Sequence, residues 1–73
     1  MTKVIICVKH NGVEYLSAVK EISEKELNEA KEMLYNAVSG HMDGFVMDCE
    51  GHELYLPMPI LLNSIVSLIY EKE

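Results

Sequence analysis

The chain has 73 residues, of which 49% are hydrophobic and 25% are charged, a composition typical of a globular protein rather than a disordered one. A chain of this length has little room for a concave site with supporting side chains, so we expect one domain, residues 1–73, that is not an enzyme. The formal net charge is −6, and all six basic residues are lysines. Because arginine is the residue best suited to gripping phosphates, we expect no direct nucleic-acid binding and favour a partner with a basic surface.

Two cysteines, Cys7 and Cys49, are present, and the sequence does not start with an apolar leader. This pattern indicates reduced thiols in the cytoplasm. The longest apolar stretch runs from Ile60 to Tyr70 and is interrupted by polar residues. It is too short to span a bilayer, so we expect no membrane partner.

A β-hairpin is predicted over residues 3–20, where two β-rich runs flank Asn11-Gly12, a dipeptide typical of two-residue hairpin turns. In this register Lys9 faces Glu14, a charge-matched pair. Both faces of the hairpin are apolar, with Val4, Ile6, Val8, Val13 and Tyr15 on one and Ile5, Cys7, Leu16 and Ala18 on the other. One helix covers only one face, so the other is either covered by the C-terminal segment or exposed and used for association.

The next segment predicts an amphipathic helix from Ser23 to Ser39. Residues 23–26 form a capping box, in which the Ser23 hydroxyl accepts from the Glu26 backbone and the Glu26 side chain reaches back. Gly40 ends the helix. Apolar residues recur at helical spacing along one side: Leu27, Ala30, Leu34, Ala37 and Val38. We expect this side to lie on a sheet.

A second hairpin is predicted from Phe45–Cys49 and His52–Leu56, with Glu50-Gly51 at the turn. One of its faces is apolar and the other is mixed. The apolar face would carry Phe45, Met47, Cys49, His52, Leu54 and Leu56.

The segment after Pro57 and Pro59 fits either a helix with a polar stripe or a buried strand. We favour a strand from Ser64 to Tyr70, because β-branched residues are frequent there, entered through a helical turn at Pro59–Leu62. The predicted fold is therefore α+β: an antiparallel sheet of four to five strands, built from two hairpins and this strand, packed against one amphipathic helix.

The stretch from Glu53 to Glu71, ELYLPMPILLNSIVSLIYE, covers about a quarter of the chain. It resembles the C-terminal ends of small uncharacterised phage and prophage proteins of Gram-positive bacteria. The resemblance implies a phage or prophage origin and carries over no catalytic residue.

Two Cys-x-x-His spacings, Cys7 to His10 and Cys49 to His52, have the residue types of a tetrahedral zinc site. Within a strand, however, Cys7 and His10 point to opposite faces, so we favour buried cysteines and expect no metal or other cofactor. Cys49 beside His52 is also a minimal nucleophile–base pair. The surrounding carboxylates disfavour the thiolate, so we expect no catalytic residue.

Acidic side chains cluster around the second hairpin, where Asp48, Glu50 and Glu53 form a candidate partner-binding site. Fixed negative charge speeds encounter with a basic partner. Our leading hypothesis is a small acidic, non-enzymatic protein-binding module, such as a phage-encoded inhibitor or modulator of a host protein. The alternative is a self-associating structural or regulatory homodimer with the sheet at its interface.

Overall fold

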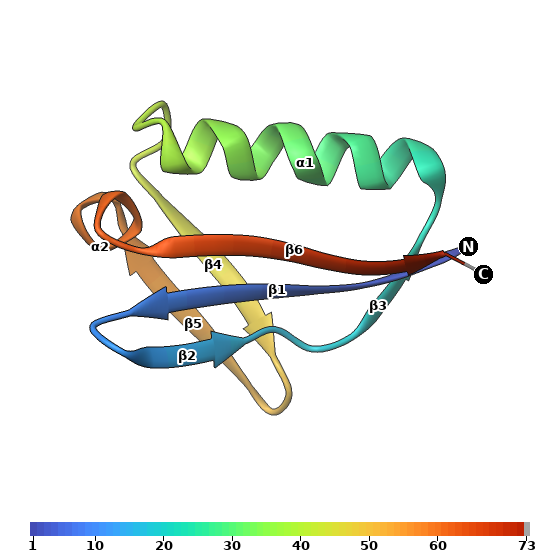
Figure 1. Ribbon diagram of the computed structural model, residues 1–73, viewed down its shortest axis with the longest axis horizontal. Helices are drawn as coiled ribbons and strands as arrows, with labels where there is room; N and C mark the ends of the chain where they lie inside the picture. The colour runs from blue at the N-terminus through green and yellow to red at the C-terminus, as the bar shows by residue number, and fades with distance from the viewer. Residues whose placement is uncertain (73) are drawn as a thin grey trace.

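The computed structural model describes residues 1–72, with only the backbone described at Lys72. Its elements in chain order are β1 (Thr2–His10), β2 (Val13–Leu16), β3 (Lys20–Ile22), α1 (Glu24–Val38), β4 (Gly44–Cys49), β5 (His52–Pro57), α2 (Met58–Leu62) and β6 (Ile65–Lys72). Figure 1 shows α1 running along β6, with the β4–β5 hairpin behind the larger sheet. The predicted α+β class is confirmed.

The larger sheet, called sheet A, is built around β1. Strand β6 pairs with β1 along one edge from Ile65 to Lys72, while β2 and β3 share the other edge, and all pairs are antiparallel. Because β1 lies between neighbours on both edges, its apolar residues on alternate positions are held in the middle of the sheet. Strands β4 and β5 form a separate two-stranded sheet, called sheet B.

The first hairpin has the predicted register, with Lys9 opposite Glu14 and His10 opposite Val13. Asn11 and Gly12 both have positive φ, 51° and 78°, which is the signature of the type I′ turn. This turn matches the right-handed twist of the two strands. The turn residues therefore fix the register as expected.

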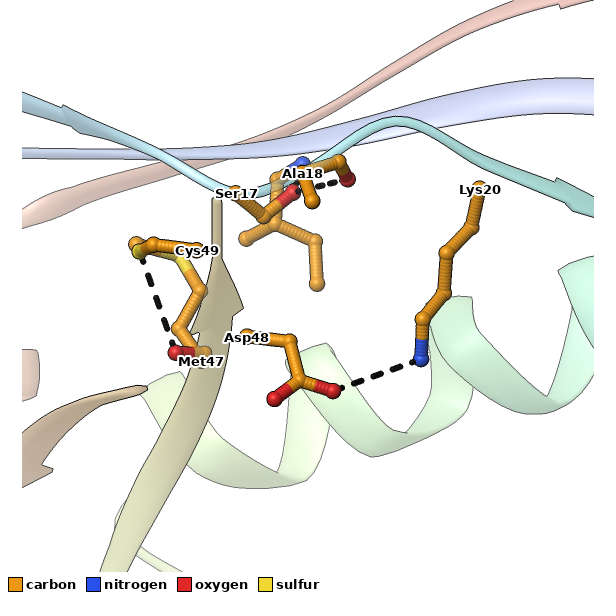
Figure 2. A network of polar contacts seen from close by, with 7 residues as sticks. Ser17, Ala18, Lys20, Met47, Asp48 and Cys49 are labelled. Atoms are coloured by element: carbon orange, nitrogen blue, oxygen red, sulfur yellow. Dashed lines mark hydrogen bonds and ion pairs between the residues drawn. The ribbon is translucent and has the colours of Figure 1, made fainter. Parts of the chain in front are cut away.

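The second strand of that hairpin is broken at Ser17, which is why β2 and β3 are separate. The Ser17 N–H donates to the Ile6 carbonyl oxygen (2.9 Å), and the Ser17 hydroxyl accepts from the Ile6 N–H (2.7 Å). The chain then turns, and the Ala18 N–H donates to the Asp48 carbonyl oxygen (2.9 Å). Figure 2 shows this junction, which joins sheet A to the edge of sheet B. Ala18 is thus drawn away from the face on which the hairpin pattern placed it.

The structure confirms the predicted capping box at the start of α1 and the end of the helix before Gly40. Glu26 N–H donates to the Ser23 hydroxyl (3.2 Å), and the Ser23 N–H donates to a Glu26 carboxylate oxygen (3.1 Å). At the other end Gly40 has φ 79°, and the His41 N–H donates to the Asn36 carbonyl oxygen (3.0 Å), which is a Schellman motif. Local hydrogen bonds therefore set both ends of the helix.

We expect Ser23→Ala to lower the free energy of unfolding by about 1 kcal/mol, because the Glu26 N–H loses its acceptor and the reciprocal bond is weakened. Chemical denaturation followed by circular dichroism measures this change. Ser39→Ala removes a hydroxyl from the opposite end of the helix and serves as the matched control. An equal loss in both variants would contradict the capping role.

The same cap predicts a pH dependence. Hydrogen bonds from Ser23 hold the pKa of the Glu26 carboxyl below its usual range. A carboxyl whose pKa is lower in the folded state stabilises the fold above its unfolded-state pKa, and that stabilisation is lost as the pH falls through the folded-state pKa. The difference in stability between the wild type and Glu26→Gln should therefore be constant near neutral pH and shrink below about pH 4.

Sheet B has the predicted register, from Gly44 opposite Pro57 to Cys49 opposite His52. Its inner face packs against the inner face of sheet A, the helix and α2. The buried core shared by these elements consists of Val8, Leu34, Ala37, Phe45, Met47, Leu56 and Leu61. This arrangement buries one face of each sheet.

The C-terminal segment confirms the favoured interpretation. A short helix, Met58–Leu62, leads into a strand, Ile65–Lys72, as predicted; the helix starts one residue earlier than expected, and the strand starts one residue later and ends two residues later. The His10 ring lies at this junction, with Nδ1 3.3 Å from the Asn63 carbonyl oxygen and 3.2 Å from the Ser64 hydroxyl. Because β6 joins the edge of sheet A, it does not cover the second face of the first hairpin.

Candidate functional site

The most distinctive surface of the protein is the second face of sheet A, called the outer face. Its residues alternate along each strand with those that enter the core. Its apolar part consists of Ile5 and Cys7 on β1, Leu16 on β2, Val19 before β3, and Ile65 and Ile69 on β6. Leu16 is 50% exposed, Ile69 53% and Ile65 69%. In Figure 1 this face is turned to the viewer, and no described element covers it.

Charged side chains lie at both ends of the outer face. At one end Lys3 stands between Glu21 of β3 and Glu71 of β6. At the other end Lys9 faces Glu14 across the first hairpin. The face therefore has an apolar centre and mixed-charge ends, which is the arrangement of a protein interface with a polar rim.

Val19 contributes to this face because of the chain break at Ser17. Together with Ile5 and Ile69 it lines a shallow hollow of about 310 Å³, bordered by Lys3, Tyr70 and Glu71. The hollow lies near the start of β1 and the end of β6, so the outer face is slightly concave at this end. A protruding apolar side chain would fit there.

Cys7 occupies the centre of the outer face, on the middle strand. It pairs with Leu16 on one side and with Ser67 on the other. Partial burial raises the pKa of the Cys7 thiol, the nearby Glu14 carboxylate raises it further, and Lys9 opposes this. The thiol is therefore protonated at neutral pH and acts as a small apolar side chain.

The structure brings the three predicted partner-binding carboxylates to the tip of sheet B. Asp48 and Glu53 are directly opposite each other, and Glu50 lies in the turn between their strands. All three are exposed, and the Lys20 ammonium lies 3.6 Å from the Asp48 carboxylate. Like charges on opposite strands destabilise a hairpin, and Lys20 offsets this only in part. The tip is thus a compact patch of negative charge.

The two Cys-x-x-His pairs lie in different surroundings. Cys7 is on the outer face of sheet A, whereas Cys49 is on the inner face of sheet B, and both thiols are free. Over residues 1–72 no group of three or more His, Cys, Asp or Glu side chains is arranged to hold a metal ion. The fold does not bring the four ligands of the considered zinc site together.

The Cys49 and His52 side chains are a cross-strand pair, as the sequence predicted. The Cys49 thiol donates to the Met47 carbonyl oxygen (3.8 Å), while His52 is exposed at the tip. The thiol therefore makes its hydrogen bond with its own strand.

A small cleft lies beside the junction of the two sheets. Its volume is about 180 Å³, and Ile6, Met33, Phe45 and Val46 are among its lining residues, with Lys20 and Asp48 at its polar side. Pockets for small organic ligands usually enclose about 300–1,000 Å³. The cleft is below this range, and the hollow on the outer face, at about 310 Å³, is at its lower limit.

Comparisons with protein-family models, curated proteins and solved structures found no match. The resemblance of residues 53–71 to phage proteins therefore stays a prediction. Among residues 1–72, no helix has the length and apolar character needed to cross a membrane.

Proposed function

We propose that the protein is a small, acidic, non-catalytic module that acts by binding another protein, with the outer face of sheet A as its contact surface. The observation that carries this proposal is the exposure of Leu16, Ile65 and Ile69 on one continuous sheet face. A contiguous group of exposed apolar residues rimmed by polar residues marks a site of interaction more often than scattered single apolar residues do. Both thiols are free, which supports a reducing, cytoplasmic setting.

The acidic tip supplies a second element of this proposal. Asp48, Glu50 and Glu53 concentrate negative charge at the end of a hairpin, where it is available to a basic surface. Exposed charges of this kind steer encounter more than they hold a complex together. The resemblance to phage proteins extends the proposal to an inhibitor or modulator of a host protein.

Partner capture from a bacterial lysate, quantified for matched variants, tests the proposal. We expect Leu16→Lys to abolish retention of the partner, because it places a charge in the apolar contact. The double variant Glu50→Lys/Glu53→Lys should slow association about tenfold and reduce its salt dependence. Retention unchanged by Leu16→Lys would contradict the assigned surface.

The control for the acidic tip is Glu29→Lys/Glu32→Lys, which changes the net charge by the same amount on the exposed side of α1. This variant should keep most of the association rate. If both double variants slow binding equally, the association rate depends on the net charge of the protein alone, and the tip has no separate role.

A further inference from the structure

The outer face has a definite pattern of rows across its strands. The two central rows are apolar or small: Ile69, Ile5 and Val19 in one, and Ser67, Cys7 and Leu16 in the other. Charged residues occupy the flanking rows, except for Ile65, which lies beside Lys9. The centre of the face therefore has no charge that an apolar partner surface would have to desolvate.

The charge of this face favours a second copy of the chain over a strongly charged partner. The face carries two lysines and three glutamates, Lys3, Lys9, Glu14, Glu21 and Glu71, so it is close to neutral. The whole chain, in contrast, has a formal charge of −6. A basic protein would be attracted to the more acidic surfaces of the molecule. Two nearly neutral outer faces can pack together without strong repulsion, with lysines and glutamates at the rim of each.

The size of the face indicates how strong such an association is. Strands about 4.8 Å apart that rise about 3.3 Å per residue give the outer face roughly 15 Å by 25 Å, or about 400 Å². Standard interfaces bury about 800 Å² per partner, and weak reversible ones bury less than about 600 Å². A face of about 400 Å² is small for a stable dimer, so we expect a weak complex that dissociates readily on dilution.

We propose that two copies of the protein pack outer face to outer face, as a two-fold symmetric homodimer with four layers: hairpin and helix, sheet A, sheet A, hairpin and helix. This inference rests on the proposed function, in which the outer face binds another protein chain, and it names that chain as a second copy of the protein; the acidic tip then remains free for a basic partner. Sheets packed face to face lie about 10 Å apart. Cys7, on the middle strand and in a central row, then lies close to its symmetry mate.

Sedimentation equilibrium over a range of protein concentrations tests the dimer. We expect a reversible monomer–dimer equilibrium for the wild type and at least a tenfold weaker one for Leu16→Lys, because the lysine would be buried in the apolar centre. Val46→Lys is the matched control, since Leu16 and Val46 are both strand residues that are 50% exposed. Circular dichroism shows whether each variant is folded. Equal weakening in both variants would overturn the proposal.

Salt separates self-association from binding to a basic partner. Two protomers of charge −6 repel each other, so screening strengthens the dimer, whereas attraction to a basic protein weakens as salt is added. We expect the dissociation constant of the dimer to fall several-fold between about 50 mM and about 500 mM salt. A rise over this range would count against the proposal.

Thiol reactivity provides a second readout of the interface. In a Cys49→Ser background, Cys7 is the remaining thiol, and the dimer should cover it, so its reaction with a maleimide should slow as the protein concentration rises. A reaction rate that does not change with protein concentration would contradict the assigned interface.

If the wild type stays monomeric up to millimolar concentration, the dimer proposal is wrong. The proposed function is then tested by partner capture alone. In that case a captured protein lost in Leu16→Lys still supports a binding module. The two failures are therefore distinguishable.

Discussion

Leu61→Ala is expected to unfold a large fraction of the protein at room temperature. Leu61 is 2% exposed and is the buried side chain of α2, where it joins the helix to the core formed by both sheets. Truncation of a fully buried leucine costs about 2–5 kcal/mol, part of which is the cavity left behind. A domain of this size rarely has more than about 3–5 kcal/mol of stability. Urea denaturation followed by circular dichroism measures the loss.

The neighbouring leucine provides the control. Leu62 is 51% exposed, so we expect Leu62→Ala to cost less than about 1 kcal/mol. Because a dimer stabilises the folded state by mass action, both variants should be compared with the wild type at one protein concentration. Similar losses at the two positions would show that α2 is not held by Leu61.

Gly44→Ala is expected to destabilise the protein by about 1–3 kcal/mol, through steric overlap rather than backbone strain. A Cβ atom at Gly44 would lie 2.9 Å from the Leu56 carbonyl oxygen and 3.5 Å from the Pro57 Cα. Both neighbours are backbone atoms of the paired strand, so they cannot move without disturbing the start of sheet B. Thermal unfolding of the purified variant measures the effect.

Gly51 is required for a different reason than Gly44: its positive φ, not a lack of space for a side chain. Its φ is 84° and a Cβ there meets nothing within 4 Å, so the cost of Gly51→Ala comes from the left-handed conformation alone. Asparagine tolerates this conformation, so Gly51→Asn should be more stable than Gly51→Ala. At Gly44 the same replacement should bring no recovery. Recovery at Gly44 would contradict the steric explanation.

The parts of the fold that the sequence predicted correctly depend on short-range signals. Asn11-Gly12 fixed the turn and register of the first hairpin, and the Ser23–Glu26 pair fixed the start of α1. The second hairpin and the C-terminal strand followed from alternating and β-branched residues. Each of these signals lies within a few residues of the structure that it determines, so no tertiary information is needed.

The arrangement of these elements could not be predicted in the same way. The break at Ser17 depends on the bond from the Ala18 N–H to the Asp48 carbonyl oxygen, which joins residues far apart in the chain. The pairing of β6 with β1 likewise depends on which sheet edge stays open. The pattern of apolar residues gives the face of a strand but not its neighbour.

The candidate site shows the same division. The sequence predicted that the second face of the first hairpin was apolar and left open whether it was covered. It did not add Val19, Ile65 and Ile69 to that face, because their places depend on the chain break and on the pairing of β6. The alternation of residues along β6 was the signal that could have placed them there. Val66 and Leu68 face the core, so Ile65, Ser67 and Ile69 must share the opposite, moderately apolar face.

The pairing of β6 with β1 also affects how the protein reaches its folded state. The two hairpins close loops of a few residues, whereas the nearest β1–β6 pair, Lys9 with Ile65, closes a loop of roughly 55 residues. Short loops form early and long-range strand pairs form late. Until β6 pairs with it, β1 has an unpaired edge that other chains can bind. We therefore expect aggregation during refolding to increase with protein concentration.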